Sequence, residues 1–304
     1  MIISLVCPVY NERESIIPFI DRISTILSSY KFELVFVNDG STDDTLSVLK
    51  SIKKTFNRDM LIVDLSRNFG KEAALSAGLA YAKGDAVIPI DVDLQDPPEI
   101  IPELINKMGE GYDMVLAKRS DRSSDGYLKR IGANLYYKVH NLLADTKIPD
   151  NVGDYRLMTR KVVEAINNLP ENQRFMKGLF AWVGFSTAKV EYQRAQRVSG
   201  TASFSGRKLL GLAINGITGF STIPLRMWLY IGSVVSMLSF MYGLYIVLRT
   251  VIYGVDVPGY ASLLTAILFV GGVQLMGLGI LGEYLGRVFL ESKRRPVYIV
   301  DNVY

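Results

Sequence analysis

The chain has 304 residues, of which 49% are hydrophobic and 21% charged, and this length and composition exclude intrinsic disorder and a disulfide-stapled miniprotein. A single cysteine, Cys7, excludes an intrachain disulfide, and a single histidine, His140, excludes a histidine-rich zinc site or a histidine-dependent triad. The net charge of +4 is unevenly placed, because residues 1–204 hold 26 basic and 26 acidic side chains whereas residues 205–304 hold 8 and 4.

The first two hundred residues alternate short apolar runs with longer helical patterns. Strands are expected at IISLVCPVY, ELVFVN, MLIVDLS, AVIPIDVD and MVLAKR, and helices at about 15–29, 43–55, 71–82 and 98–108. This alternation is typical of βαβ units, so we predict an α/β fold with a mostly parallel sheet. The opening apolar run has no basic segment before it and is soon followed by polar residues, so we interpret it as a strand and not as a signal peptide.

A polar cluster follows each of the first four strands: NERES, DGSTDD, RNFGKE and DLQDPP. Ligands of open α/β sheets bind beyond the carboxyl ends of the strands, so we expect the four clusters to meet on one rim. Asp91 and Asp93 are two residues apart near a strand end and project to the same side, which favours a divalent cation. Because Mg²⁺ completes its shell with water and substrate phosphates, this pair predicts a metal-diphosphate site. A solvated acidic turn would be the better interpretation if the pair stood alone.

The second and third clusters also contain candidate binding groups. Asp39 is placed at a strand end, where its carboxylate could accept hydrogen bonds from a base or a ribose. Ser41 is a candidate N-cap for the following helix, with Asp44 three residues on. Gly70 allows close approach of the backbone, and Lys71 lies near a helix start; both suit a phosphate group. Taken alone, such a lysine is more often only solvated.

Two long apolar segments follow in the last eighty residues. Residues 227–248 and 257–282 contain no formally charged side chain, and each can cross a hydrocarbon core of about 30 Å as a helix. Basic residues lie before the first segment and after the second, so the positive-inside rule places both chain ends in the cytoplasm. We predict two transmembrane helices within 226–282, an amphipathic juxtamembrane helix at 206–225, and a cytoplasmic C-terminal tail at 283–304.

Six segments, in order, closely resemble the family 2 glycosyltransferases, which have the GT-A fold: CPVYNE, NDGSTDDT, LSRNFGKEAALSAGL, DVDLQDPPE, VGDYRLM and LGEYLGRVFLESKRRPVY. Within that family the chain is similar to the polyprenyl-phosphate branch, which holds bactoprenol glucosyltransferases and dolichyl-phosphate mannose synthases. The resemblance covers essentially the whole chain. It implies a cytoplasmic catalytic domain at residues 1–205, with a GT-A (Rossmann-like) fold that binds a nucleotide sugar.

The resemblance implies an activity and a location. A hexose, glucose from UDP-glucose, would be transferred with inversion to undecaprenyl phosphate at the cytoplasmic face of the bacterial inner membrane. The implied pathway is O-antigen modification or other envelope glycosylation. Expected partners are the nucleotide-sugar donor, the polyprenyl-phosphate acceptor and the lipid bilayer, and no nucleic acid is expected. The glycine-rich second span leaves room for helix association, so a homo-oligomer stays open.

On the donor side, the resemblance implies roles for residues at matching positions. The nucleotide-sugar site comprises Pro8, Tyr10, Glu12, Asp39 and Asp91. Lys71 belongs to the same site as the candidate contact to a phosphate. Asp39 would face the base, and Asp91 would lie against the ribose or the sugar. Asp93 and Gln95 are implied to hold Mg²⁺ or Mn²⁺ on the diphosphate.

On the acceptor side, Arg119, Arg130 and Arg197 match arginines that meet the lipid phosphate, and residues 118–130 match the family's mobile acceptor loop. Basic residues suit an anionic acceptor that must come beside an anionic donor, although a solvated loop would explain this segment taken alone. The sequence departs from the family at Ser203, where many relatives have lysine, and this puts one cationic contact in doubt.

The expected catalytic residues are Asp91, Asp93 and Asp154. Asp154 and Arg156 lie in GDYRL, where the family keeps an active-site acid and an arginine that is structural or faces a phosphate. A phosphate monoester has a second pKa of about 6, so the acceptor is largely dianionic near neutrality and hardly needs a strong base. Asp154 is therefore left open as a general base or as a group that orients a substrate.

Other functions were weighed against this one. The same fold could use GDP-mannose, UDP-N-acetylglucosamine or a UDP-aminoarabinose derivative, because donor contacts cannot be read from one sequence. A processive polysaccharide synthase is disfavoured, since RFMKGLFAW does not reproduce the QxxRW motif and such enzymes carry more membrane spans. A non-catalytic nucleotide-sugar-binding scaffold in the membrane is disfavoured by the presence of both Asp91 and Asp93 and by the basic acceptor loop.

Overall fold

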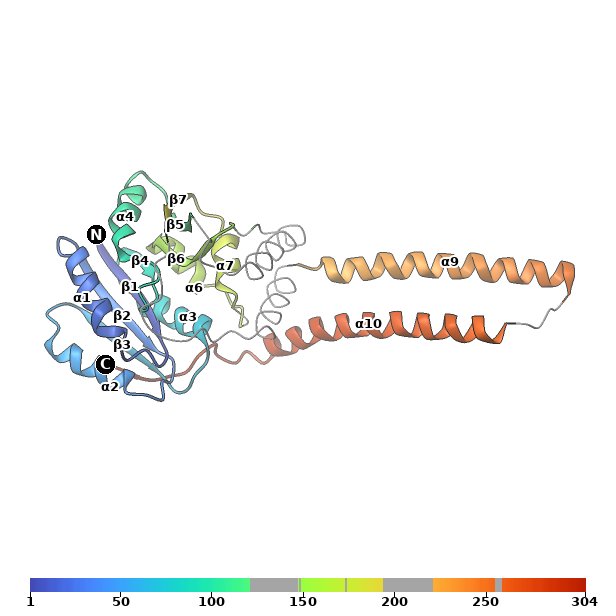
Figure 1. Cartoon of the computed structure of the whole chain (residues 1–304), viewed down its shortest axis with the longest axis horizontal. Helices are drawn as coiled ribbons and strands as arrows, with labels where there is room; N and C mark the ends of the chain where they lie inside the picture. Colours follow the sequence, from blue (N-terminus) through green and yellow to red (C-terminus); the bar gives the residue numbers. More distant parts are fainter. Residues whose placement is uncertain (121–146, 148, 173, 194–220, 255–258) are drawn as a thin grey trace.

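The structure is a computed structural model of the whole chain, and it describes residues 1–120, 147, 149–172, 174–193, 221–254 and 259–304. An α/β domain occupies the N-terminal part (Figure 1). Two long helices extend from this domain side by side, and the C-terminus returns to it.

The domain is built on an eight-stranded sheet with the order β7-β5-β6-β4-β1-β2-β3-β8. The strands are β1 (Ile2–Val9), β2 (Lys31–Asn38), β3 (Met60–Leu65), β4 (Ala86–Pro89), β5 (Met114–Arg119), β6 (Val152–Thr159), β7 (Thr187–Tyr192) and β8 (Val300–Val303). Strand β1 is parallel to β2 and β4, β2 is parallel to β3, and β5 is parallel to β7. Strand β6 runs antiparallel to β4 and β5, and β8 runs antiparallel to β3. The predicted α/β class with a mostly parallel sheet is confirmed.

Helices cover both faces of this sheet (Figure 1). They are α1 (Ile16–Ile26), α2 (Thr45–Thr55), α3 (Lys71–Tyr81), α4 (Ile101–Gly109) after a 3₁₀ turn at Pro98–Ile100, α6 (Arg160–Asn167) and α7 (Met176–Trp182). Helix α1 shows why they form, because its buried residues Ile16, Phe19, Ile20 and Ile23 recur at the spacing of one helical face.

The predicted N-cap at Ser41 is wrong. Helix α2 starts at Thr45, with Asp44 at its N-cap position. The Ser41 hydroxyl instead accepts a hydrogen bond from the backbone N–H of Asn11 at 3.0 Å, and the Thr45 N–H donates to Asp43 Oδ1 at 3.0 Å. The Ser41 side chain therefore bonds to the loop after β1, although the local sequence pattern predicted that it would cap α2.

The core lies in layers on the two sides of the sheet. Ile3, Leu5 and Cys7 of β1 pack with α1 and α4, whereas the alternate residue Val6 packs with α3, α6 and α7. Helix α3 approaches β1 closely at Gly78, where a Cβ would overlap the Val6 side chain. Because α3 follows β3 in the chain, its first residue, Lys71, lies at the carboxyl edge of the parallel strands.

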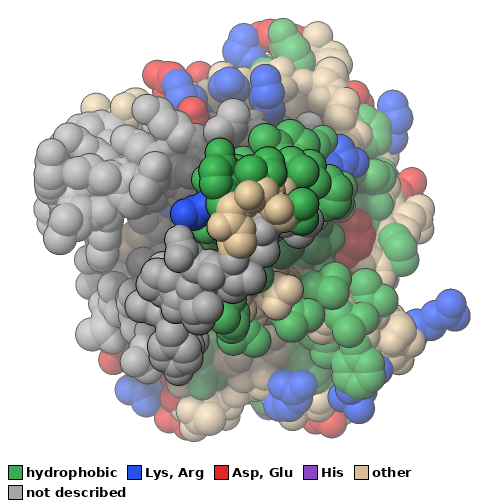
Figure 2. Space-filling model, turned by 90° about the vertical axis from the view of Figure 1, so that its right-hand side faces the viewer, with side chains coloured by type: hydrophobic (Ala, Val, Ile, Leu, Met, Phe, Trp, Pro, Cys, Tyr) green, Lys and Arg blue, Asp and Glu red, His purple; other side chains and the backbone are tan. Residues whose placement is uncertain are grey.

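The long helices are α9 (Ile223–Tyr253) and α10 (Tyr260–Ser292). By length and composition, Leu225–Tyr253 and Phe269–Ser292 could each span a membrane. Apolar side chains are exposed along both helices. Figure 2 looks at the molecule from the hairpin end, where hydrophobic side chains predominate while charged ones gather on the domain behind. Helices that are apolar and uncovered in this way are typical of membrane spans.

The end of α10 is joined to the α/β domain. Glu291 accepts hydrogen bonds from the backbone and side chain of Asn172 at 3.0 to 3.2 Å. Strand β8 then extends the sheet at β3, where the backbone groups of Tyr304 and Ile62 exchange hydrogen bonds of 2.9 and 3.0 Å. The predicted juxtamembrane helix at 206–225 lies mostly outside the described residues.

Candidate active site

The polar clusters after strands β1 to β4 meet on one rim, as the sequence predicted. Asn11 Oδ1 accepts from the backbone N–H of Thr42 at 2.8 Å, which joins the first cluster to the second. Asp39 accepts from the third cluster, and Lys71 reaches Asp91 in the loop after β4, just before the fourth cluster. Because these contacts link all four loops, the carboxyl edge of the parallel strands forms one continuous polar surface.

Asp39 anchors two of these loops. Its carboxylate is 3% exposed and accepts from the backbone N–H groups of Phe69 at 2.7 Å and Gly70 at 2.9 Å. Burial raises the pKa of Asp39, and the two backbone donors oppose that rise. The next residue, Gly40, has a φ of +64°, and a Cβ there would overlap the backbone of Arg67. The close loop contact therefore requires glycine at this position.

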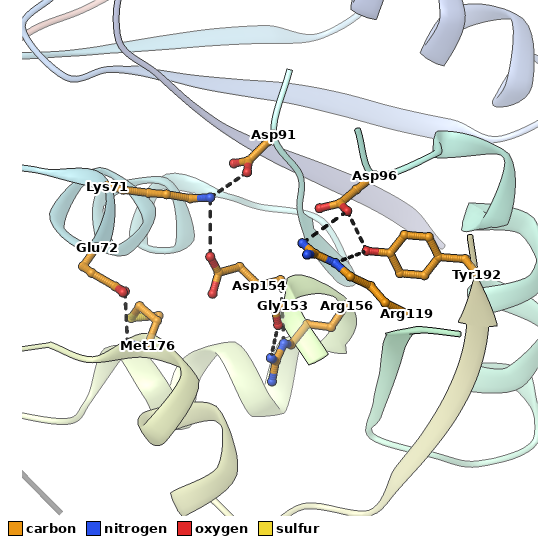
Figure 3. A network of polar contacts seen from close by, with 10 residues as sticks. All are labelled: Lys71, Glu72, Asp91, Asp96, Arg119, Gly153, Asp154, Arg156, Met176 and Tyr192. Atoms are coloured by element: carbon orange, nitrogen blue, oxygen red, sulfur yellow. Dashed lines mark hydrogen bonds and ion pairs between the residues drawn. The ribbon is translucent and has the colours of Figure 1, made fainter. Parts of the chain in front are cut away.

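Lys71 lies between two of the predicted catalytic carboxylates (Figure 3). Its ammonium is 2.6 Å from Asp91 Oδ2 and 3.5 Å from Asp154 Oδ2. Burial alone would lower the pKa of Lys71, but the two carboxylates outweigh it and raise that pKa. Burial likewise opposes ionisation of Asp154, yet Lys71, Lys177 and Arg156 hold its pKa below the usual value. Both groups are therefore charged near neutrality.

Asp154 also has a buried oxygen without a partner. Its Oδ1 atom makes no hydrogen bond to any described residue. A buried, ionised oxygen of this kind is costly unless something donates to it. Asp154 can thus accept a hydrogen bond from a bound molecule while its other oxygen stays with Lys71.

The predicted metal ligands belong to the loop after β4. Asp93 is 7% exposed, and its Oδ1 accepts from the backbone N–H of Gln95 at 3.1 Å. Carboxylate and amide oxygens are ligands that Mg²⁺ and Mn²⁺ accept. Within the described residues, no three His, Cys, Asp or Glu side chains gather into a cage for a metal. The donor set therefore fits a cation that takes most of its shell from water and phosphate oxygens.

A second group of contacts surrounds Arg119 (Figure 3). Arg119 Nη2 lies 3.8 Å from Asp96 Oδ1, and Arg119 Nε donates to the Tyr192 hydroxyl oxygen at 3.3 Å. The Tyr192 hydroxyl donates to the same Asp96 oxygen at 2.5 Å. Burial and the nearby Asp96 raise the pKa of Tyr192, so the hydroxyl keeps its proton. Asp96 and Tyr192 are not among the residues predicted from the sequence, although Asp96 stands inside the DLQDPP cluster.

Glu72, which follows Lys71 on α3, is likewise absent from the predicted residues. Glu72 Oε2 accepts from the backbone N–H of Met176 at 3.1 Å. Burial, with the nearby charge of Asp154, raises the pKa of Glu72 to about 7. The signal for Glu72 was its place beside Lys71 in the GKE motif.

Arg156 has a structural setting. It is 4% exposed, its Nη2 donates to the Gly153 carbonyl at 2.6 Å, and its guanidinium lies 4.0 Å from the centre of the Phe180 ring. Of the two roles that the sequence left open for this arginine, these contacts favour the structural one.

The remaining predicted residues are distributed as follows. Pro8 pairs in register with Val37 near the end of β1, the Tyr10 ring is 46% exposed, and Glu12 accepts from the Ser15 hydroxyl at 2.7 Å. Arg130, Arg197 and Ser203 lie outside the described residues. Of the three arginines predicted to meet the acceptor phosphate, only Arg119 belongs to the described residues.

Comparison with known proteins adds two family matches. The family described as Glycosyl transferase family 2 matches residues 4–166, and the GtrB C-terminal hairpin matches residues 223–288. The bactoprenol glucosyl transferase of Shigella phage SfV is 56% identical over 306 residues, covering 99% of each chain. The prophage bactoprenol glucosyl transferase homolog of Escherichia coli K12 is 55% identical over 307 residues, covering 100% of this chain and 99% of the relative.

Among solved structures, glucosyl-3-phosphoglycerate synthase from Mycobacterium tuberculosis, in complex with Mn²⁺, UDP-glucose and phosphoglyceric acid, is 22% identical. The match covers 71% of this chain and 77% of that one, with a TM-score of 0.48.

Proposed function

This chain belongs to glycosyl transferase family 2, as its six motifs predicted, and on that premise we propose that it is a bactoprenol glucosyl transferase. It transfers glucose from UDP-glucose to undecaprenyl phosphate. Full-length identity of 55 to 56% to relatives of that name supports this proposal, together with the hairpin match. The observation that carries the chemistry is the Lys71, Asp91 and Asp154 cluster on a rim beside Asp93 and Gln95.

In the proposed donor site, Asp93 and Gln95 would hold Mg²⁺ or Mn²⁺. When bound, the cation would stabilise the negative charge that develops on the leaving diphosphate. In this proposal the loops joined through Asp39 line the nucleotide pocket, together with the exposed Tyr10. The start of α3 faces the phosphates, because a helix N-terminus with a lysine favours anions.

Lys71 and Asp154 orient the donor in this proposal. The Lys71 ammonium helps to keep Asp154 ionised, opposes the rise that burial causes in the pKa of Asp91, and adds positive charge beside the diphosphate. The unpartnered Asp154 Oδ1 accepts a hydrogen bond from a sugar hydroxyl. This assigns Asp154 an orienting role and leaves the acceptor to act without a strong base.

The transfer itself is a single displacement. A phosphate oxygen of undecaprenyl phosphate attacks the anomeric carbon of glucose, the bond from that carbon to the β-phosphate oxygen breaks, and UDP leaves with the electron pair. The anomeric centre is inverted. Because the acceptor phosphate is already largely dianionic, no proton needs to be removed. Arg119 offsets the repulsion between the two anions, together with Arg130 and Arg197 of the sequence prediction.

The proposed location is the bacterial inner membrane, with the domain and both chain ends in the cytoplasm. The support is the exposed apolar hairpin and the basic run Lys293 to Arg295 that follows α10. Sealed vesicles of known orientation test this assignment. Protease should cleave the domain only from the cytoplasmic side, and cleavage from the periplasmic side would overturn the orientation.

A donor panel tests the function. The purified full-length protein is incubated with undecaprenyl phosphate and one donor at a time: UDP-glucose, GDP-mannose, UDP-N-acetylglucosamine or a UDP-aminoarabinose derivative. The mass of the lipid product is measured by mass spectrometry. We expect a hexose adduct with UDP-glucose and UDP release that requires the lipid. Preference for another donor would correct the sugar, and absence of lipid-dependent product with every donor would refute the transferase assignment.

A further inference from the structure

Arg119 is held by two side chains that have no role in the reaction proposed above. Tyr192 donates its hydroxyl to Asp96 at 2.5 Å, and Arg119 contacts the Tyr192 oxygen at 3.3 Å and Asp96 at 3.8 Å. Asp96 is 7% and Tyr192 5% exposed. The three groups form a compact charged triangle at the edge of the site (Figure 3).

The triangle joins three separate segments. Asp96 follows Gln95 in the loop after β4, whereas Arg119 and Tyr192 are the last residues of β5 and β7 and face each other in the parallel register. The backbone of the next residue, Ser120, donates to the Tyr192 carbonyl at 2.9 Å. The ends of β5 and β7 are thereby fixed against the loop after β4.

The surrounding packing keeps the triangle in place. The Tyr155 ring meets the Tyr192 ring edge to face at 6.1 Å, and the Tyr155 hydroxyl donates to the Pro97 carbonyl at 3.1 Å. Tyr155 is itself 1% exposed and packs in the core. One core residue therefore braces both the ring of Tyr192 and the loop that carries Asp96.

A fixed guanidinium suits the recognition of a phosphate. Arginine presents its donors in a planar fork, and a free side chain loses rotamer entropy when it binds. Contacts that hold the fork beforehand reduce that loss. Asp96 and Tyr192 can do this for Arg119 without touching the phosphate themselves.

We propose that Asp96 and Tyr192 are positioning residues for the lipid acceptor, acting through Arg119 at the point where the acceptor loop begins. The proposal rests on the proposed function, since it takes the phosphate of undecaprenyl phosphate as the anion that Arg119 meets. It distinguishes Asp96 from Asp93, its neighbour in the same motif, which serves the donor.

Steady-state kinetics of the full-length protein test this assignment. UDP release is measured while undecaprenyl phosphate and UDP-glucose are varied separately, for Tyr192→Phe, Asp96→Asn and Arg119→Ala. Tyr192→Phe removes the hydroxyl and both of its hydrogen bonds, and it should raise the KM for undecaprenyl phosphate by about 3- to 10-fold. Asp96→Asn should raise it by about 10-fold or more, because a charged partner is lost. We expect the KM for UDP-glucose to stay within about twofold of the wild-type value.

The control variant is Glu191→Gln. It breaks the Lys118–Glu191 ion pair, which joins the same two strands at 2.6 Å one register position earlier and is more exposed. Glu191→Gln should leave both KM values unchanged. If Glu191→Gln raised the KM for undecaprenyl phosphate as much as Tyr192→Phe does, any contact between β5 and β7 would influence that KM. This result would overturn the proposal.

Double variants separate positioning from a general structural role. In the Arg119→Ala background, Tyr192→Phe should have no further effect on the acceptor KM, since both act through one guanidinium. A further rise of the same size would overturn the proposal, as would an equal rise in both KM values. If Asp96→Asn does not fold, Tyr192→Phe, which removes a single oxygen, decides alone. Wild-type protein without lipid-dependent turnover would instead refute the proposed function, and this inference with it.

Discussion

Replacing Gly78 with alanine should push helix α3 away from strand β1. A Cβ at this position would overlap Val6 Cγ1 and lie 3.1 Å from Val37 Cγ2. Carbon atoms in contact are normally about 3.5–4.0 Å apart. Both valines are fully buried in the packed layers of the sheet, so neither can move aside without disturbing a central strand.

The expected cost is the difference between two effects. Overpacking a core typically costs about 1–3 kcal/mol, and alanine is about 1 kcal/mol better than glycine inside a helix. The difference is a net loss of up to roughly 2 kcal/mol, which should lower the melting temperature by up to roughly 8 °C for a domain of this size. Lys71 begins the same helix and would move relative to Asp91. We therefore expect kcat/KM for UDP-glucose to fall by roughly 10- to 100-fold, as follows from a displacement of about 1 Å.

The assay is differential scanning fluorimetry of the full-length protein in detergent, together with UDP release. Gly109→Ala is the matched control, because Gly109 ends α4 and a Cβ there would meet no atom of the described residues within 4 Å. Adding Val6→Ala to Gly78→Ala should restore part of the activity by making room for the new methyl group. A Gly78→Ala variant as stable and as active as Gly109→Ala would refute the packing argument.

Three further predictions concern Asp93 in the loop after β4, the acid Glu72 of α3, and the C-terminal strand β8. Asp93→Asn should reduce turnover by about 100-fold or more and alter its dependence on Mg²⁺ or Mn²⁺, because a charged ligand is lost; turnover like the wild type with unchanged metal dependence would contradict the assignment. Glu72 has a pKa raised from 4.5 to about 7, so its contribution to stability is present below about pH 4.5 and is lost as the pH rises towards 7. Melting temperatures between these pH values should therefore fall less steeply in Glu72→Gln than in the wild type, and identical slopes would show that Glu72 does not titrate there. Removing residues 299–304 deletes three backbone hydrogen bonds that join Ile299 and Tyr304 to β3 and the loop after it, worth roughly 2–4 kcal/mol in all. We expect a melting temperature lower by roughly 5–15 °C, and an unchanged value would mean that β8 adds nothing to the sheet.

Several features could be predicted because they depend on local pattern. The alternation of apolar runs and helical periods indicated the α/β class, and the charge-free segments indicated the two apolar helices. The meeting of the four polar clusters followed from one topological rule, since parallel neighbouring strands end at the same edge. Lys71, Asp91 and Asp154 come together on this rim as expected of a site.

Local pattern failed where two loops compete for one side chain. Ser41 has the sequence context of an N-cap, yet its hydroxyl bonds to the backbone of Asn11 from another loop. Strand β8 was not predicted either, because it too depends on a partner that lies far away in the sequence. Its residues VDNV have little hydrophobic pattern, and they form a strand because the edge of β3 provides backbone partners.

The sequence by itself determined the fold class, the apolar hairpin and the polar rim at the strand ends, because periodicity and strand-end polarity are properties of short segments. Only the tertiary structure decided the contacts of Arg119. Asp96, Arg119 and Tyr192 are up to 96 residues apart and belong to three segments. Their meeting depends on the strand order that places β5 beside β7. A buried carboxylate needs hydrogen-bond donors, and the tertiary structure determines which residues supply them. The spacing of residues along the chain does not show which donors these are.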